Sequence, residues 1–197
     1  MENSRLPSDV ERLAESLKTA PEPMAKPALV VVSGLPGTGK SRFSVSLAER
    51  VGFVVLESDA LRKVLFPLPD YSTKESTRLF RAIHHLIQRL LNRGVPVILD
   101  ATTLSEAHRE QLYSIAERTG ARLVLVEMKA PAELVYSRLE ERRSLRKEDD
   151  SVRSDADWDV YQRMEPTVER IRRRHYSVDT SQDISPVMDK IVKEIER

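Results

Sequence analysis

Apolar and polar residues alternate along this chain in blocks whose spacing switches between that of strands and that of helices. Short, nearly continuous apolar runs are typical of strands that are buried on both faces of a sheet. Five such runs predict strands over residues 28–33, 53–57, 95–100, 122–128 and 176–179. The stretches between them predict helices over residues 42–50, 75–93, 105–118, 131–143, 158–174 and from 185 onward. This alternation favours an α/β fold, with a five-stranded parallel sheet that has helices on both faces.

The first 27 residues show a different pattern. Apolar residues recur there at helical spacing and predict an amphipathic helix over residues 8–19, with Ser8 and Glu11 as a capping box. Three prolines at positions 21, 23 and 27 then predict a stiff linker. We therefore expect residues 1–27 to form a helix and linker that pack on the domain or on a second subunit, which would make a homodimer. Residues 28–197 are expected to form the domain itself.

Composition narrows the class of protein. The 197 residues suffice for one α/β domain with a sizeable core, and the formal net charge of +1 favours neither nucleic acid nor a membrane as a partner. The absence of cysteine excludes disulfides, cysteine zinc sites and thiol nucleophiles. No apolar run is long enough to span a bilayer, and a charged segment stands where a signal peptide would have its apolar core. We expect a cytoplasmic protein without a membrane partner.

The most specific signal is a phosphate-binding loop, Gly34-Leu35-Pro36-Gly37-Thr38-Gly39-Lys40-Ser41, which fits the pattern G-x-x-x-x-G-K-[ST]. It lies between a predicted strand and a predicted helix, which is the setting that this motif needs. Glycines let several backbone N–H groups point at one phosphate, and the helix N-terminus favours the same anion. Lys40 is expected to reach the β- and γ-phosphates, and the Ser41 hydroxyl to bind Mg²⁺. The nucleotide-binding set comprises Gly34, Pro36, Gly37, Thr38, Gly39, Lys40 and Ser41.

The predicted strands mostly end at polar or acidic residues. In a parallel sheet, ligands bind beyond the carboxyl ends of the strands. The strand ends continue as Ser33, Glu57-Ser58-Asp59, Asp100-Ala101-Thr102-Thr103, Lys129-Ala130-Pro131 and Asp179-Thr180-Ser181. The chemistry is expected at this edge.

A bound nucleoside triphosphate could drive motion, switch a partner or donate its γ-phosphate. A mechanical ATPase usually has an Asp-Glu pair at a strand end, whereas this chain reads Leu99-Asp100-Ala101, and it has no Asn-Lys-x-Asp guanine reader. Both departures favour transfer to a hydroxyl acceptor. Asp59, just past the second strand, is the candidate that orients and deprotonates this hydroxyl, since positioning matters more than basicity in such a reaction. Arg62, three residues on, could hold an anionic or hydroxyl-rich acceptor.

Four segments in this order resemble the small P-loop kinases of the polynucleotide kinase and zeta-toxin-like group, often described as an AAA-type ATP-binding domain. They are residues 34–41, 58–62, 100–109, and 138–142 followed by 154–157. The resemblance implies ATP and Mg²⁺ as cofactors, Asp59 as general base and a metal neighbour, and Arg62 as the group that binds the acceptor. It also implies an acceptor pocket lined by Asp100, Thr102 and Thr103, although Thr103 stands where the family usually has Asn.

The fourth segment resembles a mobile lid, around residues 138–157, whose arginine reaches over the phosphates. Arg142 is the first choice for this arginine, with Arg138 and Arg143 as second choices, because only one helical face can point inward. Asp179 resembles the family's last strand end, near the adenine.

Other signals are interpreted as structural. The four histidines, His84, His85, His108 and His175, are expected to be surface or packed residues, and Trp158 a packing residue. The arginines of residues 170–174 are offset by Glu165 and Glu169 and make a weak case for a nucleic-acid groove.

Three functions stay open from the sequence. The first is an ATP-dependent kinase acting on a hydroxyl acceptor; the low aromatic content favours a small molecule over the 5′-hydroxyl end of a polynucleotide. The second is an ATP-binding regulatory module with little turnover, and the third a toxin-type kinase of a sugar nucleotide.

Overall fold

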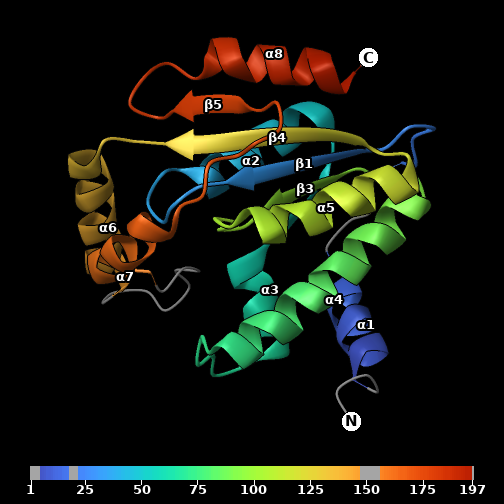
Figure 1. The fold of residues 1–197 in the computed structure, drawn as a ribbon, viewed down its shortest axis with the longest axis horizontal. Coiled ribbons are helices and arrows are strands. Elements are labelled where there is room, and N and C mark those ends of the chain that lie inside the picture. The colour runs from blue at the N-terminus through green and yellow to red at the C-terminus, as the bar shows by residue number, and fades with distance from the viewer. Residues whose placement is uncertain (1–4, 18–21, 147–155, 197) are drawn as a thin grey trace.

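The fold is built around one parallel sheet. A computed structural model describes residues 5–17, 22–146 and 156–196 (Figure 1). Its five strands lie in the order β2-β3-β1-β4-β5, and every pair is parallel. They are β1 (Ala28–Ser33), β2 (Val54–Glu57), β3 (Val97–Asp100), β4 (Arg122–Lys129) and β5 (Tyr176–Asp179). The predicted α/β fold with a five-stranded parallel sheet is confirmed.

Both faces of the sheet are covered by helices, which explains why the strands are apolar without alternation. One face packs against α3 (Ser58–Leu65), α4 (Thr73–Asn92) and α5 (Glu106–Thr119), and α1 (Leu6–Glu15) packs on α3 and α4. The other face packs against α2 (Lys40–Val51) and α8 (Ser185–Ile195). In β1, Val31 belongs to the first core and its neighbour Val30 to the second, and both are buried. Burial of one such side chain contributes about 1.5–3 kcal/mol, so each strand residue stabilises one of the two layers.

Two further helices stand beyond the carboxyl ends of the strands. These are α6 (Ala132–Arg146) and α7 (Trp158–Met164), at the left of Figure 1. They form a small apolar cluster of their own from Val135, Leu139 and Tyr161. Trp158 packs there, with its ring stacked on Tyr161 at a centroid distance of 4.8 Å, as the prediction of a packing residue requires. Of the predicted lid, residues 147–155 lie outside the described residues, and with them Ser154 and Asp155.

The N-terminal helix packs on its own domain. Val10 and Leu13 of α1 are buried in the core that α3 and α4 share. The predicted capping box is wrong, because the helix begins at Leu6, with Pro7 in its first turn, and Ser8 lies inside it. The helix also ends at Glu15, before the predicted residue 19. The homodimer and the domain boundary at residue 28 stay predictions.

The predicted helix over residues 158–174 is wrong in its second half. Helix α7 ends at Met164 and is followed by a single 3₁₀ turn, Glu165–Thr167. Pro166 explains the break, since proline has no N–H to donate to the carbonyl four residues earlier and its ring clashes with that carbonyl. Beyond the turn, the backbone N–H of Glu169 donates to the carbonyl of Leu104, so this segment is tied to the loop that follows β3.

A short helix that the apolar pattern did not separate, α3, starts directly at the end of β2. Among residues 5–17, 22–146 and 156–196, no helix has both the length and the apolar character needed to cross a membrane.

Candidate active site

The loop between β1 and α2 has the backbone geometry of a phosphate cradle. Gly37 and Gly39 adopt positive φ angles of 79° and 92°, and Gly39 is the N-cap residue of α2. These angles strain any residue with a side chain. A Cβ on Gly37 would also lie 2.7 Å from Cγ1 of Val135, because α6 packs directly on the loop. The loop therefore needs glycine here both for its fold and for the approach of α6.

Lys40, Ser41 and Asp100 meet where β1 and β3 run side by side. The Nζ of Lys40 donates to the carbonyl of Leu35 at 3.0 Å, and the Ser41 hydroxyl donates to the Asp100 carboxylate. Burial raises the pKa of Asp100 to about 6, although Lys40 and Ser41 act to lower it. Burial also lowers the pKa of Lys40, whereas Asp100 and Asp59 favour its charged form. The side chains of Lys40, Asp100 and Asp59 thus lie close together where burial limits their contact with water.

One atom of this group is conspicuous. The Oδ2 atom of Asp100 is buried and has no hydrogen-bond partner within the described part of the chain. A buried carboxylate oxygen without a donor is costly unless a ligand satisfies it. With the Ser41 hydroxyl beside it, this oxygen fits Mg²⁺, which takes one or two protein oxygens and completes its shell with phosphate and water. No cluster of three His, Asp or Glu side chains that could hold a metal occurs among the described residues.

The neighbouring strand end brings further carboxylates. In the parallel pairing of β2 and β3, Glu57 stands opposite Asp100. Two residues later, Asp59 lies in the first turn of α3, is half-buried and lines the cleft that also contains Lys40. Glu57 was noted in the sequence only as part of a strand end. The pairing of β2 with β3 gives it a place beside the predicted metal site.

Arg62 is more buried than we expect of a side chain that binds an acceptor at the surface. Its guanidinium is buried, forms an ion pair with Glu75 and lies over the ring of Tyr71, 4.7 Å from the centroid. Its Nη2 donates to the hydroxyl of Ser76 at 3.3 Å, while its buried Nε has no partner among the described residues. Arg62 does line the cleft, but Glu75 already offsets its charge.

The loop after β3 presents Thr102 and Thr103 to the same cleft. The carbonyl of Thr103 accepts hydrogen bonds from the Ser33 hydroxyl at 2.9 Å and from Nη1 of Arg109 at 2.7 Å. The Thr103 hydroxyl oxygen is buried without a partner among the described residues. The backbone of this loop is held firmly, which leaves that hydroxyl for a ligand.

The three candidate arginines of α6 face three directions. Arg142 lines the cleft. Arg138 donates to Oγ1 of Thr180 at 2.7 Å and to the carbonyl of Gly37 at 3.3 Å, so it joins α6, the loop and the end of β5. Arg143 is exposed and pairs with Glu140.

Asp179 ends β5, next to Thr180, to which Arg138 donates. The Asp179 carboxylate accepts hydrogen bonds from the backbone and hydroxyl of Ser181, which hold its pKa below the usual range. Pro36, Gly37 and Gly39 line the cleft, whereas Gly34, Thr38, Arg138 and Asp179 are not among its lining residues.

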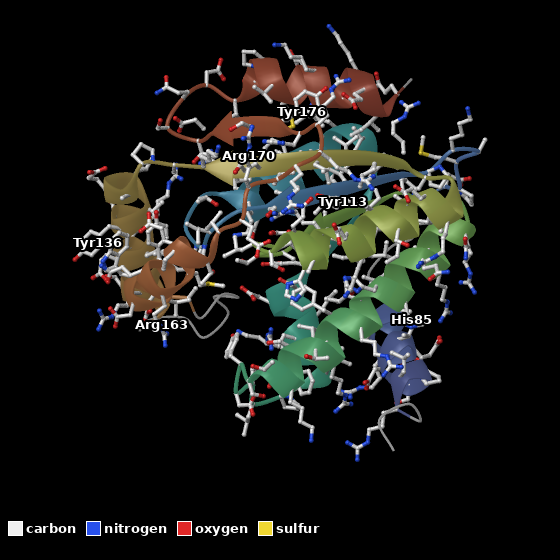
Figure 2. The ribbon with its side chains drawn as sticks, in the orientation of Figure 1. His85, Tyr113, Tyr136, Arg163, Arg170 and Tyr176 are labelled. Carbon is white, nitrogen blue, oxygen red and sulfur yellow. The ribbon has the colours of Figure 1, made fainter. Side chains whose placement is uncertain are left out.

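The cleft itself is large, about 1590 Å³, and reaches well beyond the predicted residues. Figure 2 labels two of its lining residues, Arg163 on α7 and His85 on α4, which lie on opposite sides of the molecule in this view. Between α4 and α5 the lining includes three of the histidines that were expected to be packed or surface residues, together with side chains for which the sequence suggested no role. They are Phe80, Arg81, His84, His85, Gln88, His108, Gln111 and Arg118. For Phe80, His84 and Gln88 the sequence signal was their spacing, four residues apart on one face of α4.

Comparison with known proteins places this architecture among nucleotide-binding domains. A domain family described as "AAA domain" matches residues 29–176, which is most of the chain and includes all four segments of the resemblance, whereas Asp179 at the end of β5 lies outside the match.

Two curated relatives carry the names of kinases. The chain is 30% identical over 119 residues to L-seryl-tRNA(Sec) kinase of Methanococcus maripaludis, covering 58% of this chain and 46% of that protein. It is 28% identical over 111 residues to adenylyl-sulfate kinase of Myxococcus xanthus, covering 54% and 60%. The match thus spans about half the length of these curated relatives.

Among solved structures, APS kinase of Mycobacterium tuberculosis in complex with AMPPNP and APS superimposes with a TM-score of 0.65. The superposition covers 89% of this chain and 100% of that chain, at 18% identity. At this identity the likeness shows a shared fold.

Proposed function

The chain belongs to the AAA domain family, and we propose on this premise that it is an ATP-dependent kinase, which transfers the γ-phosphate of ATP to a hydroxyl-bearing acceptor. The observation that carries the proposal is the constellation of Lys40, Ser41 and Asp100, with the Asp100 Oδ2 atom buried and unpartnered beside the glycine loop. Both curated relatives are kinases by name, which supports the reaction class.

The phosphate end of the nucleotide would be held by the loop and α2. Backbone N–H groups of the loop, at the N-terminus of α2, bind phosphate oxygens, and Lys40 exchanges its bond with the Leu35 carbonyl for one with phosphate. Ser41 and Asp100 would hold Mg²⁺, which neutralises charge on the phosphates when it is bound. This assigns Asp100 to the metal rather than to the acceptor, where the sequence resemblance had put it.

Two side chains face the transferred group from different elements. Asp59, at the start of α3, would orient the acceptor hydroxyl and accept its proton late in the transfer. Arg142, from α6, would stabilise the negative charge on the phosphoryl group in transit. Both line the cleft that contains Lys40, which supports these roles.

The acceptor would lie between α3, the loop after β3 and the N-terminal half of α4. The unpartnered Thr103 hydroxyl and the unpartnered Nε of Arg62 are available to bind it, and both belong to residues that line the cleft. By their names, the two curated relatives act on a seryl-tRNA and on adenylyl sulfate. Similarity to kinases therefore does not decide which acceptor this chain uses.

The test is a transfer assay with γ-labelled ATP and Mg²⁺, on panels of nucleosides, sugars, amino alcohols and 5′-hydroxyl oligonucleotides. We expect label on at least one acceptor and a loss of about 10²-fold or more in kcat with Asp59→Asn, while ATP affinity is kept. Asp189→Asn is the matched control, since Asp189 is an exposed acid on α8 that pairs with Arg50. Undiminished transfer by the Asp59 variant would refute the role of Asp59. ATP binding without transfer to any panel would favour the regulatory module.

A further inference from the structure

Three ring-bearing side chains converge in the part of the cleft between α4 and α5. The rings of Phe80 and His108 are nearly parallel, with an interplanar angle of 13° and centroids 6.4 Å apart. His84 approaches Phe80 from the next turn of α4, at a centroid distance of 6.3 Å and an angle of 46°. The closely stacked pair Trp158 and Tyr161 has a centroid distance of only 4.8 Å. The Phe80 and His108 rings are thus parallel but more widely separated.

Phe80 packs against the core beneath α4 and α5 but is not fully buried in it. The core beneath α4 and α5 is made by fully buried aliphatic side chains, among them Leu79, Ile83 and Leu112. Phe80 is only half-buried, His108 is exposed, and both line the cleft. Phe80 thus packs against the core and also borders the cleft, and His108 borders the cleft from α5.

The surroundings of the rings are polar and nearly neutral. Burial lowers the pKa of His84 to about 4, with His108 and His85 acting in the same direction and a hydrogen bond to Gln111 acting against it. His84 is thus uncharged at neutral pH and can both donate and accept a hydrogen bond. Gln88 and Gln111 also line this part of the cleft. Arg81, Arg118 and Glu110 carry the charges of its lining.

The rings also lie at a suitable place along the cleft. Ser76, which bonds to Arg62, is one helical turn before Phe80 on α4. Four residues of helix rise by about 6 Å, so the rings stand one turn beyond the expected acceptor anchor. An acceptor with its hydroxyl at Asp59 would place a group attached a few bonds away against these rings.

We propose that Phe80 and His108 form a subsite for the planar base of a nucleoside-type acceptor, with His84, Gln88 and Gln111 at the edge of the base. Stacking on aromatic faces and hydrogen bonds from amide side chains are how proteins recognise bases. A sugar or an amino alcohol lacks the planar aromatic ring that stacks face to face on such side chains. The inference rests on the proposed kinase function, and it fits both the small molecule that the low aromatic content favoured and a polynucleotide end. A free nucleoside and the 5′-hydroxyl end of an oligonucleotide share this chemistry.

The experiment measures acceptor binding while the nucleotide site is filled. The full chain is saturated with AMPPNP and Mg²⁺, and is then titrated by calorimetry with the four ribonucleosides, a 5′-hydroxyl hexanucleotide and ribose. Phe80→Leu keeps apolar volume while removing the ring, and His108→Ala changes an exposed residue, so both variants should fold. Lys74→Ala, at an exposed position of α4 outside the cleft lining, is the control. The same proteins are assayed for transfer from γ-labelled ATP.

We expect a base-bearing compound to bind and ribose not to bind. Phe80→Leu and His108→Ala should each weaken binding by roughly 5- to 100-fold, and Lys74→Ala by less than twofold. Tighter binding of the hexanucleotide than of any nucleoside would identify a polynucleotide end as the source of the base, and the reverse a free nucleoside.

Two results would overturn the subsite: no binding of any base-bearing compound, or equal binding by both ring variants and the unsubstituted protein. Transfer to a sugar together with either result would leave the kinase proposal intact. Base binding that depends on both rings, without transfer to any acceptor, would support the subsite and contradict the proposed kinase function.

Discussion

Arg109 shows how a single buried charge can organise the acceptor side of the site. Its side chain is 1% exposed, and its guanidinium donates to the Glu106 carboxylate and to the carbonyls of Thr103, Glu169 and Arg170 at 2.7–3.2 Å. The planar fork of five donors suits several acceptors at once. It joins the loop after β3 to the segment that returns from α7, so both are held in place by one residue.

We predict that Arg109→Met lowers the free energy of unfolding by about 3–5 kcal/mol, because it leaves the buried Glu106 carboxylate without this donor, removes the bonds to the carbonyls of Glu169 and Arg170, and takes away one of the two donors to the Thr103 carbonyl. Urea unfolding followed by circular dichroism measures this. Arg118→Met, on the same helix, serves as the control, since Arg118 bonds to Ser114 at an exposed site and should cost less than about 0.5 kcal/mol. Equal losses in both variants would mean that the buried fork has no special role.

At the scale of elements, α1 packs on α3 and α4, the helices that contribute residues to the proposed acceptor site. Asp9 is 2% exposed and accepts two hydrogen bonds from Arg78 of α4, at 2.6 and 2.7 Å. Arg12 donates to the carbonyl of Val64 in α3. Glu11 pairs with Arg89 of α4, but in an exposed position. The helix outside the nucleotide-binding pattern therefore supports α3 and α4, which position Asp59, Arg62 and the ring subsite.

Two substitutions that neutralise a carboxylate in α1 should lower the free energy of unfolding by different amounts. Asp9→Asn should lower the free energy of unfolding by about 1–3 kcal/mol, because it breaks a two-bonded ion pair whose carboxylate is buried. Glu11→Gln should change it by less than about 1 kcal/mol, since exposed pairs are weak. Chemical denaturation of the two variants side by side makes the comparison, and a larger loss for Glu11→Gln would contradict the assigned role of α1.

At the scale of the whole molecule, the site is assembled from parts distant in the chain. The loop after β1 supplies Lys40 and Ser41, β3 supplies Asp100, and α3 and α6 supply Asp59 and Arg142. A ligand that joins these parts binds only the folded protein, so it should raise thermal stability by mass action.

We predict that MgATP at about 100 times its Kd stabilises the protein by about 2.7 kcal/mol, which raises Tm by roughly 5–10 °C for a chain of this size. EDTA should remove more than half of this rise, and Asp100→Asn should make the remaining rise insensitive to Mg²⁺, because the carboxylate beside Ser41 is lost. Scanning calorimetry with ATP, with and without EDTA, measures both effects. A Tm rise that EDTA leaves unchanged would argue against a metal at Ser41 and Asp100.

Much of this architecture follows from local pattern. Apolar runs with strand and helix spacing predicted all five strands and the parallel sheet, because a strand buried on two faces needs apolar residues at every position. The glycine loop was readable as well, since its positive φ angles at Gly37 and Gly39 demand residues without side chains. Errors arose where local signals competed, as at Pro166, which breaks the predicted helix, and at Ser8, which Pro7 places inside a helix.

The sequence by itself determined the fold class, the phosphate loop and the edge of the sheet at which polar residues gather, because these depend on neighbouring residues. Only the tertiary structure decided which side chains contact one another. It placed Asp100 against Ser41, paired Arg62 with Glu75, buried Arg109 among carbonyls and brought Phe80 of α4 opposite His108 of α5. The physical reason is that the energy of a buried charge or ring depends on what faces it, and the facing group comes from a distant part of the chain.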